Sequence, residues 1–335
     1  MKGWGAVTVV AVALVWTAGA EAVSLDWVFI GDAGNAGELS GVGAGGFGPN
    51  RICGAVDYDY YISKYEITNG QYREFLNAVA AEDTYGLYHV NMGSTYGGIT
   101  QNGSPGDYTY APKGNDPNWD AKPANYVSYY DCLRFANWLH NGQPSGAQTA
   151  GTTEDGAYTF SGLTTVSDRN PEAKMFLTSE DEWYKAAFYK GGGTDAGYWD
   201  YATQRDTKPD NNPPASDSGN SVNYYNLYED DYAAGPPYYS TDVGAYTLSG
   251  SAYGTFDQNG NMWEWNEALL SGAYRGLRGG SWSNVGYFLP AAWRYDVADP
   301  EEEIHDTGFR VAMIPEPSAV SVLIVGVALL RWRRR

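Results

Sequence analysis

The segment Arg278-Gly-Gly-Ser-Trp-Ser-Asn-Val-Gly-Tyr-Phe-Leu289 carries the strongest signal in this chain. Three other motifs accompany it: Phe176-Leu-Thr-Ser-Glu-Asp-Glu-Trp-Tyr-Lys-Ala-Ala187, Gly260-Asn-Met-Trp-Glu-Trp265 and Gly308-Phe-Arg310. Together, residues 176–310 indicate the fold. The last part of the quoted segment, from Ser283 onward, bears on the chemistry that the fold can perform.

Local signals around these motifs predict three helices. Thr68-Asn-Gly-Gln71 has the form of a capping box, and apolar residues then recur at helical spacing up to residue 79. A second helix is expected from Ser128 to Asn141, with Gly142 as a C-cap, and a third from residue 178 or 179 to 190. A first strand is expected at 28–30, and long Gly-, Asn- and Tyr-rich stretches separate these elements.

The motif series resembles the formylglycine-generating enzyme, or sulfatase-modifying factor, domain. Lys64-Tyr-Glu-Ile-Thr-Asn69 is similar to the family's opening element, and Pro123-Ala-Asn-Tyr-Val-Ser-Tyr129 to its middle one. The resemblance covers residues 55–313, preceded by a loop-rich lead-in over 23–54. It implies an α+β, C-type-lectin-like fold with little regular structure, which accounts for the long loops.

The same resemblance implies that the family's oxidase chemistry is missing. Its enzymes act through two cysteines just after the Gly-Gly-Ser-aromatic element, and position by position these fall on Asn284 and Leu289. Thiolates bind copper(I) because soft sulfur suits that ion, whereas an amide is a poor ligand and a leucine is none. Cys53 and Cys132 lie in other motifs, so copper-dependent oxidation is not expected.

The best metal candidate is Asp257-Gln-Asn-Gly-Asn-Met-Trp-Glu264. Calcium takes six to eight oxygens from carboxylates and backbone carbonyls, and a Gly-Asn turn lets the chain fold around an ion. The family's calcium loop carries over onto Asp257, Gly260, Met262 and Glu264. The alternative is a turn held by hydrogen bonds between carboxylates and amides.

A second and weaker calcium site of the family falls on Asn223, Tyr224, Gly244 and Tyr246. The usual acidic ligand of that site is Gly244 in this chain, which counts against it.

An iron site like that of the related sulfoxide synthases is not expected. Those enzymes draw three histidines largely from an extra helical domain, and this chain has only His89, His140 and His305. His140 is expected to interact with carbonyls at a helix end, and His305 to lie in an exposed acidic loop after Glu301-Glu-Glu303.

Other patterns favour structural roles. Cys53 and Cys132 either form one bridge or are simply buried. The acidic residues 181 and 182 are expected to cap a helix. The pairs Tyr224-Tyr225 and Tyr238-Tyr239 either line a sugar-binding face or pack loops, and loop packing is the interpretation favoured here. The glycines at 41–46 lack the Lys-Ser/Thr of a phosphate loop.

Composition excludes some classes of partner. The chain has 335 residues, with 43% hydrophobic and 15% aromatic side chains, enough for a sizeable core. Its net charge of −19 repels nucleic acid and anionic lipid.

The N-terminus has the form of an export signal over residues 1–22. Met1-Lys2 precedes an apolar run from Trp4 to Ala20, and cleavage by signal peptidase is expected after Ala22 or, second, after Ala20. The alternative is an uncleaved membrane anchor.

Residues 314–335 form a tail in three parts: Pro315-Glu316-Pro317, an apolar run over 319–330, and an arginine cluster over 331–335. The apolar run reaches roughly 18 Å, short of a hydrocarbon core about 30 Å thick. The tail resembles the PEP-CTERM sorting signal, which implies exosortase as a partner. The alternative is a plain tail anchor with its arginines in the cytoplasm.

The sequence therefore predicts an exported protein, anchored in the inner membrane before processing and then delivered to the envelope, surface or matrix. Its domain is expected to be a non-catalytic, calcium-braced module for a polysaccharide or protein ligand. The rival hypothesis is an oxidoreductase of the formylglycine-generating and nonheme-iron superfamily that acts on thiols; it requires copper or iron where the first requires only calcium.

Overall fold

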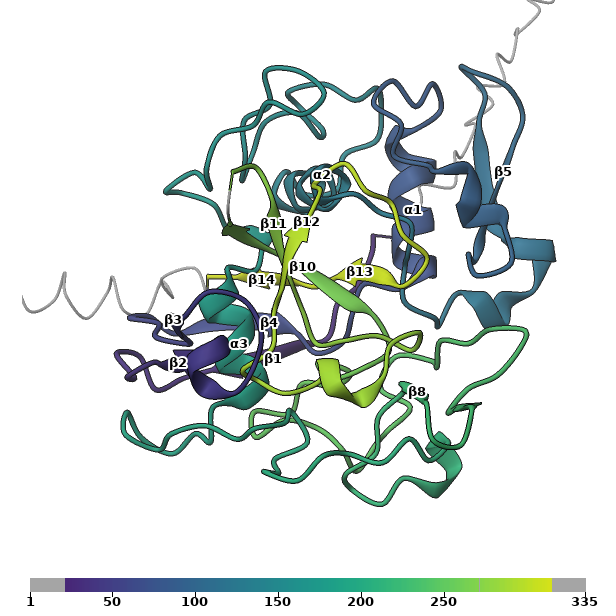
Figure 1. The fold of residues 1–335 in the computed structure, drawn as a ribbon. Coiled ribbons are helices and arrows are strands. Elements are labelled where there is room, and N and C mark those ends of the chain that lie inside the picture. The colour runs from purple at the N-terminus through teal and green to yellow at the C-terminus, as the bar shows by residue number, and fades with distance from the viewer. Residues whose placement is uncertain (1–21, 271, 315–335) are drawn as a thin grey trace, which may run out of the picture.

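The computed structural model describes residues 22–270 and 272–314 (Figure 1). Ala20 of the predicted export signal and Pro315, Glu316 and Pro317 of the predicted sorting tail lie outside these residues. Among the residues described, none of the helices is long and apolar enough to cross a bilayer.

Two four-stranded sheets form the frame of the molecule. The first has the order β1-β4-β14-β7 and is antiparallel throughout, whereas in the second, β12-β11-β10-β13, strand β13 runs parallel to β10. The strands of the first sheet are β1 (Trp27–Ile30), β4 (Tyr60–Ser63), β14 (Val311–Met313) and β7 (Met175–Leu177). Those of the second are β12 (Tyr295–Ala298), β11 (Arg275–Arg278), β10 (Trp263–Leu269) and β13 (Thr307–Phe309).

Three two-stranded hairpins lie outside these sheets. They are β2 (Glu38–Ser40) with β3 (Arg51–Cys53), β5 (Ile99–Asn102) with β6 (Thr109–Pro112), and β8 (Tyr225–Asn226) with β9 (Asp231–Tyr232). Figure 1 shows how much of the chain between these elements is irregular, above all the teal and green segment that carries β8.

The three predicted helices are confirmed, each with a capping box. They are α1 (Asn69–Val79), α2 (Tyr129–His140) and α3 (Glu180–Phe188), capped by Thr68, Ser128 and Ser179. In each box the cap side chain accepts from the third helical amide, and the side chain of that third residue accepts from the cap amide. Helix α3 ends at Phe188, two residues before the predicted end, because Tyr189 is extended.

Aromatic side chains join α1 to α2 in the main core. The ring of Phe75 lies 5.3 Å from that of Phe135 and 5.2 Å from that of Trp138, measured between centroids. Tyr72 stacks on Phe135 and also meets Phe309 of β13 edge-on. The apolar face of each helix is therefore buried against the other helix and the sheets.

Buried charges connect the sequence motifs to one another. Glu264 on β10 accepts hydrogen bonds of 2.6 Å from Arg310, and the Trp183 indole N–H donates to it at 2.7 Å. Arg278 pairs with Glu180 at 2.6 Å in the same way. The charged residues of the four motifs are thus structural partners, and the expected α+β, loop-rich architecture is present.

Candidate binding site beside residues 284–289

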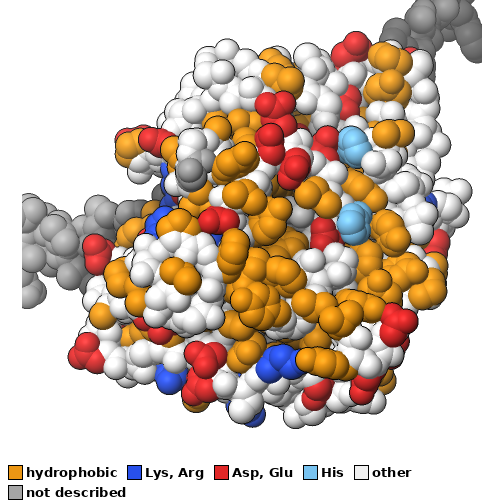
Figure 2. All heavy atoms as spheres, viewed as in Figure 1, with side chains coloured by type: hydrophobic (Ala, Val, Ile, Leu, Met, Phe, Trp, Pro, Cys, Tyr) orange, Lys and Arg blue, Asp and Glu red, His pale blue; other side chains and the backbone are white. Residues whose placement is uncertain are grey.

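A groove of about 410 Å³ opens beside the segment in which the family has its cysteines. We call it the aromatic groove because most of its side chains are aromatic: Tyr201, Tyr224, Tyr225, Tyr228, Tyr287 and Trp293. Its wall includes Val285 and Gly286, which belong to the segment 278–289 that opens the sequence analysis, and the adjacent Pro290. Figure 2 shows hydrophobic side chains gathered across the middle and lower part of the face that carries β8.

The groove is assembled from separate stretches of chain. Tyr224 is buried at its floor, and a side chain at Gly286 would meet the Tyr224 ring at 3.0 Å. Glycine at 286 therefore allows this ring to lie against the backbone. Trp293 is also buried, whereas Tyr287 and Tyr228 stand exposed at the rim. Of the Tyr224-Tyr225 pair, favoured above as loop packing, both residues line the groove.

Asn284 is held in place by its neighbours. Its side-chain oxygen accepts hydrogen bonds from the Trp263 indole N–H and, at 2.8 Å, from the Ser281 hydroxyl. Its backbone oxygen accepts from the Tyr225 amide at 2.9 Å. The amide at the first thiol position is therefore part of the scaffold.

Leu289, at the second thiol position, is 1% exposed and packs with Val222 and Tyr224 in a small apolar cluster. Neither this position nor 284 offers sulfur to a soft metal.

Two serines lie next to Asn284. Asp306 accepts from the hydroxyls of Ser281, at 2.6 Å, and Ser283. Nucleophilic serine chemistry needs an adjacent base such as histidine. Within the part of the chain that the structure describes, no histidine hydrogen-bonds to either serine.

The two cysteines are free and buried, as the second of the two alternatives predicts. Burial raises the pKa of Cys53 to about 11, although the Arg278 guanidinium lies 3.4 Å from its sulfur. Burial also raises the pKa of Cys132 well above its usual value, and this thiol donates to the Ser128 carbonyl. Neither group is a thiolate at neutral pH.

The three histidines lie in different parts of the structure. His140 accepts a hydrogen bond from the Lys174 amide at 3.0 Å, instead of meeting terminal helix carbonyls. His305 is not in an exposed loop as expected: it is half-buried, 5.2 Å from the Tyr96 ring and 5.3 Å from the Trp282 ring. His89 lies 3.9 Å from Glu303. Within residues 22–270 and 272–314, no three His, Cys, Asp or Glu side chains are grouped as metal ligands.

The predicted calcium residues sit in a buried acidic cluster. Asp257 accepts from the Gly244 amide at 2.6 Å, while both oxygens of Glu264 are used by Arg310 and Trp183. Glu66, which the sequence did not single out, accepts from the Met262 amide at 3.0 Å. Burial and then the charges of Asp257 and Glu264 raise the pKa of Glu66 well above its usual value.

The donor atoms around Asp257 are of the type that a divalent cation prefers, although the three carboxyl groups of this cluster do not form a set of metal ligands among the described residues. Glu66, Asp257 and Glu264 are buried near one guanidinium, that of Arg310, which pairs with Glu264, and burial raises the pKa of Asp257 to about 6. All the donors are oxygens, which suits Ca²⁺. Asp257 would hold the ion with the Gly260 and Met262 carbonyls, and Glu264 would contribute charge. The calcium assignment stays a prediction.

The second predicted calcium set is partly linked to the first. The Gly244 amide donates to Asp257, and a cavity of about 10 Å³ lies between Asp257 and Tyr246. The side-chain oxygen of Asn223 is buried without a hydrogen-bond partner among the described residues. Tyr224 turns its ring toward the aromatic groove.

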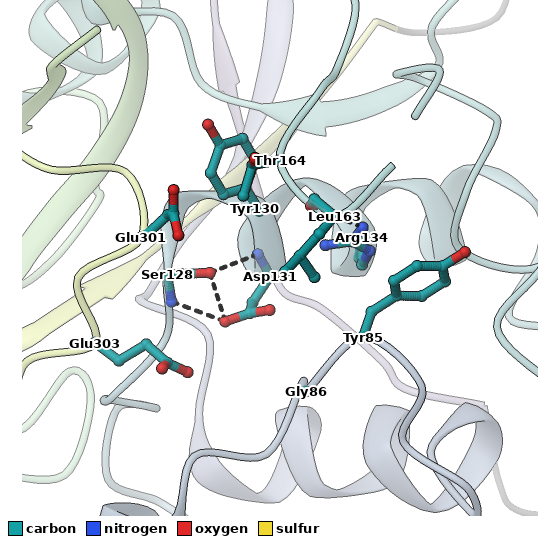
Figure 3. Close-up of a pocket in the computed structure, with 10 residues that line it drawn as sticks. All are labelled: Tyr85, Gly86, Ser128, Tyr130, Asp131, Arg134, Leu163, Thr164, Glu301 and Glu303. Carbon is teal, nitrogen blue, oxygen red and sulfur yellow. Dashed lines mark hydrogen bonds between the residues drawn. The ribbon is translucent and has the colours of Figure 1, made fainter. Parts of the chain in front are cut away.

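A smaller, acidic pocket of about 130 Å³ lies at the start of α2 (Figure 3). Asp131, Glu301 and Glu303 face it with Tyr85, and Arg134 lies at its edge. Burial, and then the neighbouring acids Asp131 and Asp83, raise the pKa of Glu303 to about 8.

Comparisons with known proteins identify the family and the fold. The chain matches the model of the sulfatase-modifying factor enzyme 1-like domain over residues 54–314. The structure is similar to the crystal structure of CarF, with a TM-score of 0.53 and 20% identity over 88% of this chain and 99% of that chain. Comparison with curated protein sequences gave no significant match.

Two further solved structures share the fold. Treponema denticola variable protein 1 has a TM-score of 0.50 and 18% identity over 89% of this chain and 98% of its own. PvdO from Pseudomonas aeruginosa has a TM-score of 0.50 and 18% identity over 86% of this chain and 94% of its own. The family match spans more than half of the chain, and the α+β, C-type-lectin-like architecture agrees with it. The chain therefore belongs to the family defined by the sulfatase-modifying factor enzyme 1-like domain.

Proposed function

We propose that this chain is an exported, exosortase-sorted protein of the envelope or matrix whose domain binds a ligand instead of oxidising a thiol. The observation that carries the proposal is the environment of the two thiol positions. The Asn284 amide is fixed by Trp263 and Ser281, and Leu289 is packed in an apolar cluster. Both positions serve the scaffold.

The remaining thiols support the same conclusion. A catalytic cysteine needs a thiolate in a partly exposed site. Cys53 and Cys132 are buried, and burial raises the pKa of each. The rival hypothesis of a thiol oxidase therefore lacks a candidate nucleophile among the described residues.

The aromatic groove supports a binding role. Ligand sites are concave, mostly apolar and about 300–1,000 Å³ in volume, with a few polar groups that orient the ligand. A groove of about 410 Å³ with exposed tyrosines meets that description, and it adjoins the segment on which the family's chemistry depends. Fold alone does not give function, so the groove carries this argument. A polysaccharide or a protein segment is the ligand class proposed for it.

Calcium completes the proposal as a structural ion at Asp257. It would offset the excess negative charge of Glu66, Asp257 and Glu264 and so hold the surrounding loops. The export signal and the sorting tail, with Glu316 in its recognition element, supply the proposed route out of the cell.

The test uses protein purified from a strain with active exosortase. It is incubated with copper(I) and a cysteine-containing sulfatase peptide, beside an active member of the family and a no-protein control. We expect no formylglycine above the no-protein control, since positions 284 and 289 lack thiols. Aldehyde product in that assay contradicts the proposal and redirects attention to Cys53 or Cys132.

Intact-mass measurement of the same protein tests the sorting part. We expect a mature chain that ends near Pro315–Pro317, and an uncut precursor when Glu316 is replaced. A mature chain that still ends at Arg335 rejects exosortase sorting in favour of a plain tail anchor.

A further inference from the structure

We propose that the acidic pocket at the start of α2 binds a primary ammonium group, which donates hydrogen bonds to Asp131 and Glu303. This pocket, drawn in Figure 3, shares no lining residue with the aromatic groove. It is therefore a second site, beyond the proposed function. Buried oxygens without partners, the local charge and the size of the pocket all point to this ligand.

Asp131 has a buried oxygen that no part of the fold uses. Its side chain lines the pocket and the residue is 3% exposed. One carboxylate oxygen accepts both hydrogen bonds from Ser128, at 2.9 Å from the amide and 2.7 Å from the hydroxyl. The other oxygen accepts none among the described residues and is turned away from Ser128 (Figure 3). Leaving a buried acceptor without a partner is costly, so a ligand N–H that donates to it is favoured.

Glu303 offers a second oxygen of the same kind. Its Oε1 atom is buried and has no hydrogen-bond partner within residues 22–270 and 272–314. Its Oε2 atom lies 3.9 Å from His89 Nε2, which is too far for a hydrogen bond. Asp131 belongs to α2, whereas Glu303 precedes β13 in the chain. Two separate elements therefore present acceptors to one pocket (Figure 3).

The charge of the pocket favours a cation. Three of its lining side chains are acidic, and its one basic lining side chain, Arg134, is already paired. Arg134 donates to both oxygens of Glu154, at 2.8 and 3.0 Å, and to the carbonyls of Gly162 and Leu163. Among the described residues, no lysine or arginine forms an ion pair with the three acids of the pocket. In a chain with a net charge of −19, such a pocket attracts cations and repels anions.

The arrangement of the acids favours an ammonium over a metal ion. Calcium needs several oxygens that converge on one point, and no three acids are grouped in this way in the part of the chain that the structure describes. An ammonium has three N–H donors, each of which can meet a different acceptor. The pocket measures about 130 Å³, below the roughly 300–1,000 Å³ of sites for larger ligands, so it suits the end of a small amine. Tyr130 and Leu163 in its wall suit the alkyl stem.

Binding should release a proton from Glu303. Burial, and then the charges of Asp131 and Asp83, raise the pKa of Glu303 to about 8. Its further neighbours are Glu301 on its own segment and His89, which is neutral at pH 7 because burial lowers its pKa. Glu303 therefore holds a proton at pH 7 in the empty pocket, and a bound ammonium favours the ionised form.

The experiment is a calorimetric titration of the purified protein with four probes, with calcium in the buffer so that the cluster at Asp257 does not contribute. The probes are diaminobutane, a lysine amide acetylated at its α-nitrogen, butanediol and tetramethylammonium. We expect the diamine or the blocked lysine, or both, to bind. The diol lacks charge and tetramethylammonium lacks N–H donors, so each should bind at least about tenfold more weakly. The two amines distinguish a free amine from a lysine side chain of a partner as the source of the ammonium.

The proton release has its own readout. The better amine is titrated at pH 7 in buffers of different ionisation enthalpy, which reports the protons released on binding. The affinity should also be about tenfold higher at pH 8 than at pH 6, because Glu303 must ionise while a primary amine stays charged over this range.

Variants assign the residues. Glu303→Gln should weaken amine binding about tenfold and abolish the proton release. Asp131→Asn should weaken binding similarly, because it keeps the oxygen that Ser128 uses but turns an NH₂ group toward the ammonium. Glu302→Gln is the matched control: it makes the same change in the same segment, and Glu302 is exposed and does not line the pocket. It should bind like the wild type, and all variants are compared by melting temperature to verify folding.

Five results overturn the assignment. They are butanediol or tetramethylammonium binding as tight as amine binding, amine binding only when calcium is left out, no proton release, no effect of Glu303→Gln, or no amine binding at all. None of them bears on formylglycine formation or on the aromatic groove, so a failure here is distinguishable from a failure of the proposed function.

Discussion

At the scale of the residue, Arg310 places a positive charge where no solvent reaches it. Its guanidinium donates two 2.6 Å hydrogen bonds to Glu264 and a further one to the Phe256 carbonyl at 2.9 Å. Moving such ions out of water costs several kcal/mol each, and good geometry with additional hydrogen bonds is needed to recover it. The Gly308-Phe-Arg310 motif is therefore a structural partner of the tryptophan-rich motif at 260–265.

Arg310→Met tests this pairing. Removal of the guanidinium leaves Glu264 buried without its main partner, so the free energy of unfolding should fall by about 3–5 kcal/mol, as measured by urea denaturation. Arg205→Met is the control because Arg205 is exposed and its side chain, among the described residues, donates only to the neighbouring Gln204 carbonyl. The control should change stability by no more than about 0.5 kcal/mol. Equal stability of the two variants contradicts the role given to Arg310.

Single residues also mark the limit of prediction from sequence. Asp257 and Glu264 lie in one short stretch of sequence, so the sequence brings them together directly. Glu66 hydrogen-bonds Asn261 across 195 positions, and no local pattern announces that contact. Lys208 and Trp293 both line the groove but come from distant segments of the chain, so no local pattern predicts that they lie together. The one available signal was the Tyr224-Tyr225 pair, whose sugar-face interpretation was stated as an alternative.

At the scale of the element, helices were predictable and strand pairing was not. A capping box is a contact between residues three apart, so the sequence displays it, and all three boxes are present. By contrast, Ala312 of β14 pairs with Ile62 of β4 and with Phe176 of β7, across long stretches of loop. Strands of three or four residues carry too short a pattern to specify such partners.

The capping box of α2 predicts a pH dependence. Burial raises the pKa of Asp131 to about 6 from 3.8, although hydrogen bonds from Ser128 oppose that shift. The folded state holds the proton more tightly than the unfolded chain. The contribution of Asp131 to the free energy of unfolding should therefore fall as pH rises from about 4 to about 6, and stay level above that range. Asp131→Asn should remove up to about 3 kcal/mol of that fall, measured by denaturation at several pH values.

The comparison variant is Asp131→Ala. Asparagine keeps an oxygen that accepts from the Ser128 amide, whereas alanine loses this half of the capping box and keeps only the bond that the Ser128 hydroxyl accepts. Alanine should therefore be less stable than the wild type by about 1 kcal/mol at pH 4, where the wild-type side chain is protonated. An unchanged pH profile in Asp131→Asn contradicts the assignment of the shift to this residue.

At the scale of the whole molecule, polar side chains replace regular structure as the support of long loops. Asp217 accepts from the Gly219 and Leu248 amides and from the Ser249 hydroxyl, and so joins distant parts of one irregular segment. The acidic cluster at Asp257 lies next to that segment through the Gly244 amide. An ion bound there would therefore stabilise the part of the molecule that has the fewest helices and strands.

Calcium dependence tests that statement. A chelator should lower the melting temperature, because an ion bound only to the native state stabilises it, by about 2.7 kcal/mol at one hundred times its dissociation constant. Asp257→Ala should abolish the difference between chelated and calcium-loaded protein. Asp195→Ala, an exposed acid in the same long segment, should keep it. Identical melting curves of the wild type with and without chelator count against calcium.

The position of β14 affects the order in which the chain is synthesised and folds. This strand, Val311–Met313, lies between β4 and β7, and Arg310 immediately before it carries the buried charge that Glu264 requires. A polypeptide made from its N-terminus cannot complete that sheet until nearly all of the domain has been synthesised. Closure of this sheet, and with it formation of the Glu264–Arg310 pair, is therefore a late step in the folding of a newly made chain.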